Sequence, residues 1–100
     1  MTWTLASAES RAAEHASFKI PSRAEREGLR VGDFAKLIFI ESVEGGPLHG
    51  ERMWVEIARV EGTHYRYRGL LRNTPVQIQD LDAGASIEFG PEHVADLEVA

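Results

Sequence analysis

The sequence predicts a single α+β domain in which one N-terminal helix packs on a curved antiparallel sheet of about four or five strands. Three observations support this fold class. An alanine-rich segment opens the chain, short apolar segments follow it, and glycine and proline residues separate those segments. A chain of 100 residues has the size of one ordinary domain. We therefore assign the helix and the chain that leads out of it to residues 1–20, and the β-rich body to residues 29–100.

Residues 4–17 form the predicted helix. Their apolar positions recur at helical spacing and are Leu5, Ala8, Ala12 and Ala16. Pro21 ends this segment, because proline disfavours helical geometry in the residue before it. Residues 22–29 predict a polar connector, with one helical turn closed by Gly28 as its alternative form. A narrow stripe of alanines predicts a helix that lies close against the sheet.

Residues 34–41 (FAKLIFIE) form the strongest strand prediction. Both alternating sets of positions are largely apolar, which is typical of a strand covered on both faces. We therefore expect this strand to lie at the centre of the sheet. Residues 43–50 (VEGGPLHG) contain three glycines and one proline, so they predict a loop.

Two further strands are predicted over residues 51–60 and 64–72, with residues 61–63 as the loop between them. If Val60 faces His64, the apolar sets of the two strands share one face. That face places Met53, Val55 and Ile57 opposite Leu71, Gly69 and Tyr67. The polar face places Arg52, Trp54 and Glu56 opposite Arg72, Leu70 and Arg68.

The C-terminal third predicts a connector after Pro75 and two short segments on the sheet. Residues 84–90 (GASIEFG) predict a strand, and residues 93–99 (HVADLEV) predict a last strand or turn. The residues expected to point inward from these segments are Ile87, Phe89, Leu97 and Val99. A short pattern occurs twice before a strand, as Leu29-x-x-Gly32 and Leu81-x-x-Gly84, and it predicts the same turn used twice.

The composition excludes several classes of protein. The chain has no cysteine, which excludes disulfides, thiolate metal sites and cysteine nucleophiles. Its net charge of -5 argues against nucleic acid and anionic membranes as general partners. No apolar run approaches the ~18 residues that a membrane span needs. The first ten residues lack the features of a secretory signal, so we expect a cytoplasmic protein.

Three segments carry a family resemblance. They are GERMWV (50–55), YRGLLRNTP (67–75) and LDAGASIEFGPEHVAD (81–96). In this order they resemble the uncharacterised bacterial family called domain of unknown function 2314, over about residues 18–97. The resemblance implies a small α+β domain and no assigned activity. One departure is Ala85, where the family more often has aspartate, and Ser86 or Asp82 could replace a lost turn hydrogen bond there.

Trp54 is the centre of the candidate binding site. It falls on the polar face of its strand, among arginines that could hold a small anionic ligand or a protein partner. The proposed site residues are Arg52, Trp54, Tyr67, Arg68 and Asn73. We favour a second interpretation, in which the N-terminal helix covers Trp54 and the arginines pair with Glu9 and Glu14. For Asn73 we favour a turn-forming role, with an amide pointing into a pocket beside Trp54 as the alternative.

Enzymatic function has little support. The chain has no phosphate-binding glycine motif, no Gly-x-Ser-x-Gly elbow and no HExxH helix. We therefore expect no catalytic residue, no metal and no cofactor. A small metal-dependent hydrolase would use His49, Glu51 and His93. We instead expect His93 to be a structural cap at the start of the last segment.

The function predicted from the sequence is a non-enzymatic binding or interaction domain with an unknown protein or a small anionic ligand as its partner. A layout related to this one occurs in some immunity proteins, which bind and block a toxin, so an immunity-type protein is a further alternative by analogy. It would use the acidic end formed by Glu92, Asp96 and Glu98. We expect a monomer or a weak homodimer.

Overall fold

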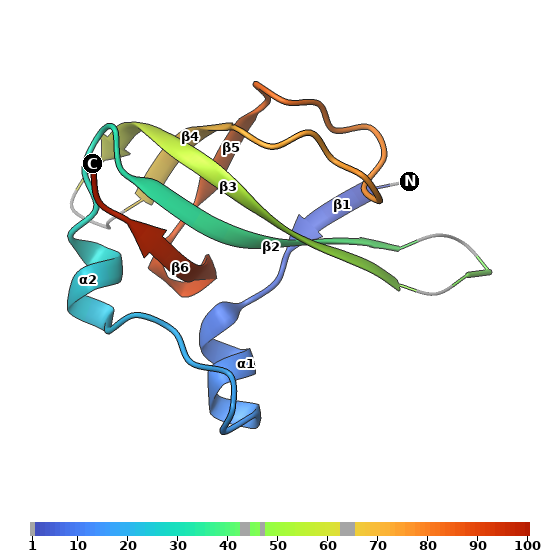
Figure 1. The fold of residues 1–100 in the computed structure, drawn as a ribbon, viewed down its shortest axis with the longest axis horizontal. Coiled ribbons are helices and arrows are strands. Elements are labelled where there is room, and N and C mark those ends of the chain that lie inside the picture. The colour runs from blue at the N-terminus through green and yellow to red at the C-terminus, as the bar shows by residue number, and fades with distance from the viewer. Residues whose placement is uncertain (1, 43–44, 47, 63–65) are drawn as a thin grey trace.

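The computed structural model describes residues 2–42, 45–46, 48–62 and 66–100. Within them the chain forms one curved antiparallel sheet of six strands, with two short helices and one 3₁₀ turn, an α+β arrangement (Figure 1). The strands are β1 (Thr2–Leu5), β2 (Phe34–Ser42), β3 (Leu48–Glu61), β4 (Arg66–Leu71), β5 (Ser86–Phe89) and β6 (Val94–Glu98). The other elements are α1 (Ala8–Glu14), α2 (Arg23–Glu27) and η1 (Pro91–His93).

β2 is the central strand, as predicted. β3 pairs with β2 over residues 34–42, and the opposite edge of β2 is shared by two strands. β6 pairs with residues 34–37 of that edge, and β1 pairs with residues 39–42. The remaining strands follow in the order β3, β4, β5. The sheet therefore has six strands, more than the four or five predicted.

The predicted helix over residues 4–17 is wrong at both ends. Residues 2–5 form β1 instead, with Leu5 opposite Phe39 and the Trp3 ring 5.4 Å from that of Phe39. The helix begins after Ser7, whose side chain accepts the Ser10 N–H at 3.1 Å, and it ends at Glu14. Pairing with β2 and contact with its core side chains outweigh the helical preference of the first residues.

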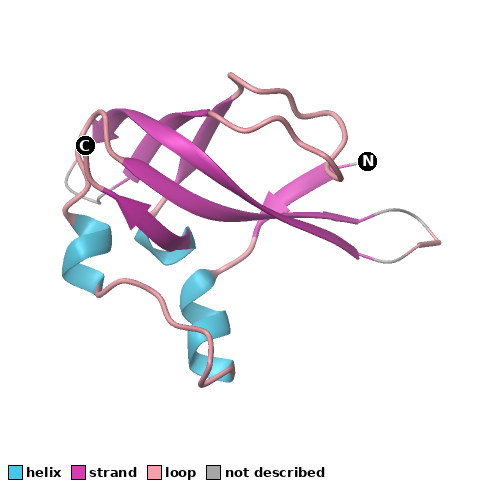
Figure 2. Cartoon of the chain, viewed as in Figure 1, coloured by secondary structure: helices cyan, strands magenta, loops and turns pink. Residues whose placement is uncertain are grey.

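The second short helix, α2, confirms the helical turn suggested for the polar connector. It begins with a capping box in which Ser22 and Glu25 each accept the backbone N–H of the other. It ends at Gly28, as predicted. Figure 2 shows both helices on the same side of the sheet in this view.

The core lies on the concave face of the sheet, where the side chains of five strands meet. Its fully buried members include Leu37, Phe39, Met53, Val55, Ile57, Tyr67, Leu71, Ile87 and Phe89. The inward positions predicted for β5 are therefore confirmed. Leu97 is half-buried against this core, but Val99 is 68% exposed, so its inward prediction is wrong. Val99 lies beyond the end of β6 and no longer follows its alternation.

The β3–β4 hairpin keeps the predicted faces over part of its length but not the predicted register. Val55 lies opposite Leu71 rather than Gly69, a shift of two residues that preserves the alternation, so residues 55–57 stay on their predicted faces. An irregularity between Ile57 and Arg59 adds one more residue to the shift. Beyond it Val60 lies opposite Tyr67 instead of His64, so the faces predicted for the end of β3 are wrong. The predicted loop at residues 61–63 ends outside the described residues.

The loop between β2 and β3 is shorter than predicted. The predicted loop over residues 43–50 is too long, because β3 already begins at Leu48, opposite Ser42. Residues 43, 44 and 47 lie outside the described part.

β3 and β4 approach each other closely at Gly69. A Cβ atom at this position would lie 2.6 Å from the Glu56 carbonyl oxygen. Only glycine fits there without a shift of the sheet.

The turn predicted to occur twice does so. Gly32 and Gly84 have φ angles of 95° and 91°, a conformation that favours glycine. In each turn the residue after the glycine donates its N–H to the carbonyl three residues earlier, at 3.0 Å. The first turn has one further bond, from the Arg30 N–H to Asp33 Oδ2 at 2.8 Å. Ala85 offers no such acceptor in the second turn, and within the described chain neither Ser86 nor Asp82 supplies a side-chain replacement.

Candidate functional site

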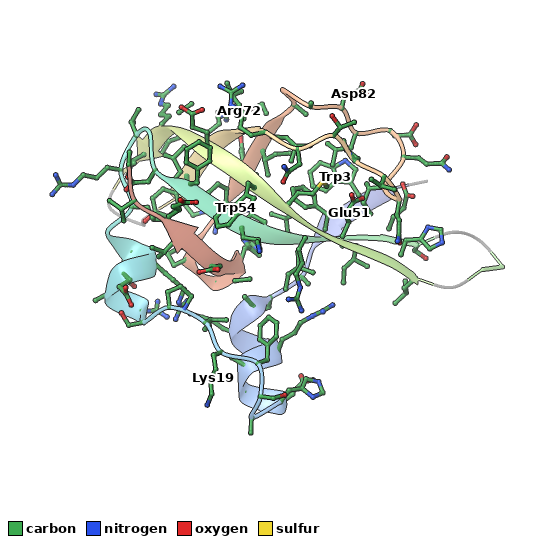
Figure 3. All side chains as sticks on the ribbon, viewed as in Figure 1. Trp3, Lys19, Glu51, Trp54, Arg72 and Asp82 are labelled. Atoms are coloured by element: carbon green, nitrogen blue, oxygen red, sulfur yellow. The ribbon has the colours of Figure 1, made fainter. Side chains whose placement is uncertain are left out.

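Trp54 is half-buried on the convex face of the sheet, directly opposite Lys36 on β2. The Lys36 Nζ lies 5.0 Å from the centre of the indole ring, which is a cation–π contact. The interpretation that α1 covers Trp54 is wrong. α1 buries Ala8 against Ile38 and Ala95 instead, because β1 occupies the far half of β2 and brings α1 down beside Ile38. Figure 3 shows Trp54 in the middle of the sheet, away from α1.

Asn73 has the turn-forming role that the sequence favoured. Its Oδ1 accepts the backbone N–H of Trp54 at 2.6 Å, and its Nδ2 donates to the Arg72 carbonyl at 3.4 Å. These bonds hold the end of β4 against β3. A hollow of about 350 Å³ also opens here. It is lined by Phe34, Trp54, Arg72, Asn73, Glu98, Val99 and Ala100.

Two of the predicted site residues lie elsewhere. Tyr67 is 1% exposed on the concave face, and its hydroxyl donates to the Arg26 carbonyl at 2.8 Å. Arg68 is exposed on the convex face and pairs with Glu88 and, at 3.4 Å, with Glu61. The five predicted residues therefore do not form one site. The alternation of β4 had already placed Tyr67 on the apolar face.

Arg52 lines a second hollow, of about 550 Å³, on the convex face. Its guanidinium lies 5.2 Å from the centre of the Phe18 ring. The floor comes from β2, β3 and β6, and the connector between α1 and α2 forms one wall. We call this the basic hollow, and its lining residues are Ser17, Phe18, Lys19, Ile20, Pro21, Glu25, Lys36, Arg52, Ala95, Asp96 and Leu97.

The cations of the basic hollow are Lys19, Lys36 and Arg52. Within the described part of the chain none of them forms an ion pair, whereas Arg66 and Arg68 of β4 and Arg72, which follows it, all do so. Those arginines pair with Glu92, with Glu88 and Glu61, and with Glu56. The basic hollow thus gathers the positive charge that the fold leaves uncompensated on this face.

Two carboxylates also line the basic hollow, and both are already engaged. Glu25 accepts the Ser22 N–H at 3.0 Å. This bond, and a smaller effect of the Ser22 hydroxyl, lower the pKa of Glu25 below its ordinary value. Asp96 accepts the Leu97 N–H at 2.9 Å. Neither one forms an ion pair with Lys36 or Arg52 in the described structure, although Asp96 lies directly opposite Lys36.

Sequence reasoning missed Phe18, Lys19 and Lys36. Lys36 had a usable signal, since it is the one charged residue in the apolar stretch FAKLIFI (34–40). Phe18 and Lys19 had none, because the connector has no periodicity. Figure 3 shows Lys19 on this connector, below the sheet.

The residues of the hydrolase alternative have other roles. The Glu51 carboxylate accepts the backbone N–H groups of Val76, Gln77 and Ile78 at 2.9–3.2 Å. His93 Nδ1 accepts the Gly90 N–H at 3.0 Å, which confirms the predicted structural cap. His49 Nδ1 is buried and has no hydrogen-bond partner among the residues that the structure describes. Among the described residues no group of three or more His, Cys, Asp or Glu is placed to hold a metal ion.

The acidic residues of the immunity alternative are divided between two places. Glu92 in η1 pairs with Arg66 at 3.2 Å. Asp96 and Glu98 lie on β6, opposite Lys36 and Phe34 respectively. Of these three acidic residues, Glu92 therefore pairs with an arginine of β4, Arg66, within the molecule.

Among the described residues no helix is long and apolar enough to cross a membrane. Comparison with known proteins found no family model that matches the chain, no matching curated protein and no matching solved structure.

Proposed function

We propose that this chain is a non-enzymatic cytoplasmic binding domain that holds the anionic group of a ligand or partner protein in the basic hollow. The observation that carries the proposal is the absence of an ion pair at Lys19, Lys36 and Arg52 in the described structure. The proposed kinship with domain of unknown function 2314 adds no activity to it.

The positions of Lys36 and Arg52 suit a shared anion. Lys36 faces Trp54 and Arg52 faces Ile38, so the two cations are diagonal neighbours on the same face of β2 and β3. Diagonal neighbours on adjacent strands have Cβ atoms about 7–8 Å apart, and both side chains are long enough to reach one carboxylate or phosphate between them. Their hydrogen bonds to such a group would be charge-assisted and stronger than neutral ones.

The surroundings limit how far these cations can turn away. Lys36 is half-buried and packed on the Trp54 ring, and the Arg52 guanidinium is packed on the Phe18 ring. These two aromatic contacts restrict the positions that the two cations can take, and the Trp54 ring itself lines the other hollow. Partial burial of Lys36 also weakens the screening of its charge by water, whereas Arg52 is exposed.

The test is an NMR titration of the full chain with inorganic phosphate, with citrate and with an acidic peptide, followed through the backbone amides. We expect at least one of them to shift amides around the basic hollow, with binding that weakens as salt is added. Lys36→Gln and Arg52→Gln should each weaken binding about tenfold.

Arg59→Gln is the matched control, because Arg59 is an exposed arginine on β3 that has no ion pair in the described chain. It should leave binding unchanged. If none of the anions binds, or if Arg59→Gln weakens binding as much as Arg52→Gln, the basic hollow is not the site.

A further inference from the structure

We infer that the occupant of the basic hollow is an extended peptide segment of a partner protein, with acidic side chains at every second residue. This inference rests on the proposed function and specifies its ligand. Four properties of the surface carry it: the length of the groove, the spacing of its cations, the unused backbone groups along its walls and the carboxylates between the cations.

The groove is longer than a small anion requires. The basic hollow adjoins another of about 660 Å³, and the two share Ser17, Phe18 and Arg52. Together they run from the β6 residues 95–97, past Arg52, to residues 11–15 at the end of α1. An extended chain of several residues would fill this length, whereas a phosphate would fill one end of it.

The spacing of Lys36 and Arg52 matches an extended peptide. Along their strands the two cations are offset by two residues, since Lys36 faces Trp54 and Arg52 faces Ile38. A strand rises about 3.3 Å per residue, so that offset is about 6.6 Å. Side chains at positions i and i+2 of an extended peptide point to the same side with the same offset along the chain. The remaining offset of about 4.8 Å, across the two strands, is within reach of the long lysine and arginine side chains. Each cation can then meet its own carboxylate.

Backbone groups along the groove are available to such a chain. In the described structure Lys19 and Ile20 make no backbone hydrogen bond, although they form the connector wall. On the opposite side β6 pairs, among the described strands, with β2 alone, although its Leu97 N–H already has the Asp96 side chain as its partner. Unpaired backbone at an edge is what strand addition uses. A small anion would leave these groups unused.

The charges along the groove favour alternation over a uniform polyanion. Its carboxylates, Glu14, Glu25 and Asp96, lie among its cations, Arg11, Lys19, Lys36 and Arg52. A chain with a negative charge at every position, such as a nucleic acid backbone, would meet these carboxylates as well as the cations. An alternating peptide can place its uncharged residues beside them, against the apolar surface of Ile20 and Pro21.

The experiment compares four probes on the full, isotope-labelled chain. They are a peptide of alternating glutamate and valine, a peptide of the same composition with its glutamates contiguous, inorganic phosphate, and a short oligothymidine. We expect the alternating peptide to bind at least tenfold more tightly than the other three. It should also shift the amides of Lys19, Ile20 and Leu97.

Charge-reversal variants locate the binding. Arg52→Glu and Lys36→Glu should each weaken binding of the alternating peptide tenfold or more. A peptide in which lysine replaces only the one glutamate that meets the reversed residue should recover affinity for that variant. Arg59→Glu, the same change on an exposed arginine of the same strand, should change the affinity less than twofold. Backbone amide spectra establish that each variant is folded.

The outcomes separate this inference from the proposed function. If phosphate or the contiguous peptide binds as tightly as the alternating peptide, and Lys36 and Arg52 are needed for it, the peptide inference is overturned and the anion site stands. If the oligothymidine binds most tightly, the ligand is nucleic acid and the inference is again overturned. If no probe binds at the groove, both proposals are overturned.

Discussion

The Nη1 atom of Arg26 lies 2.6 Å from Oε2 of Glu9 and thereby joins α2 to α1. Arg26 is 6% exposed, and it serves more than this ion pair. Its guanidinium also donates to the carbonyls of Pro21 and Pro91, at 2.9 and 2.8 Å. Its own carbonyl accepts the Tyr67 hydroxyl. One buried arginine therefore holds both helices and η1 to the sheet.

Replacing Arg26 with methionine should lower the free energy of unfolding by about 2–4 kcal/mol, because two carbonyls and a carboxylate lose their donor. Arg23→Met is the matched control. Arg23 also pairs with Glu9, at 3.1 Å, but its side chain is 67% exposed, and such pairs contribute about 0–1 kcal/mol. Urea denaturation measures both variants. Equal losses would show that Arg26 acts only as a surface charge.

The pH dependence of stability should begin with His93. Burial lowers the pKa of His93 below its ordinary value of 6.5, with opposing effects of Glu92 and Glu9 and a further lowering by Arg66. The folded state thus binds the proton more weakly than the unfolded state. Its contribution is complete above pH 6.5 and is lost as the pH falls toward the lowered pKa. A protonated Nδ1 can no longer accept the Gly90 N–H.

His93→Asn tests this, since the asparagine Oδ1 can accept the Gly90 N–H without titrating. Unfolding free energies measured against pH should fall just below pH 6.5 in the original protein and stay level there in the variant. Below pH 4.5 both should lose stability, because the Arg26 hydrogen bond lowers the pKa of Glu9 and that stabilisation is lost as Glu9 is protonated. A curve unchanged by His93→Asn would contradict the assignment.

Glu51 holds the loop between β4 and β5 (Figure 3). Burial raises the pKa of Glu51, but the N–H groups of Gln77, Val76 and Ile78 more than offset this, so the pKa lies below its ordinary value. Glu41, which is fully buried, accepts the next N–H, that of Gln79, at 3.2 Å. Two carboxylates of neighbouring strands therefore hold four consecutive amides.

Glu51→Ala should speed hydrogen exchange at residues 76–78 tenfold or more and cost about 1.5–3 kcal/mol, the range for hydrogen bonds to a charged group. Glu56→Ala is the control on the same strand. It removes the 2.9 Å pair with Arg72 and should leave the exchange of this loop unchanged. If residues 76–78 remain protected from hydrogen exchange in Glu51→Ala, Glu41 alone is sufficient to hold this loop.

The two equivalent turns make a reciprocal prediction. In the first, Asp33 Oδ2 accepts the Arg30 N–H at 2.8 Å and Asp33 Oδ1 accepts the Ala100 N–H at 3.0 Å, so Asp33→Ala should cost about 1.5–3 kcal/mol. In the second, Ala85 occupies the equivalent position, and Ala85→Asp should stabilise by a smaller amount, about 0.5–1.5 kcal/mol, through the Asp82 N–H. Thermal unfolding measures both. A loss of stability in Ala85→Asp would mean that the half-buried site at residue 85 penalises the charge more than the turn gains.

Local patterns in the sequence determined much of the fold. The apolar character of both sides of residues 34–41 was enough to identify the central strand. The alternation in residues 51–57 assigned each side chain to its correct face, although the register was wrong by two residues there and by three beyond the irregularity at residues 57–59. Alternation has a period of two, so it cannot distinguish registers that differ by two. The paired glycine turns were also readable, because a positive φ is a local requirement.

The tertiary structure decided what lies next to what. Residues 2–5 have helical neighbours in the sequence, yet they become a strand because one edge of β2 is open to them. The same pairing places α1 against Ile38, so α1 does not cover Trp54 and the Trp54 ring contacts Lys36 instead. The basic hollow needs side chains from the connector, β2, β3 and β6 at once. Such a set depends on contacts between distant segments, and the periodicity of a single segment carries no information about them.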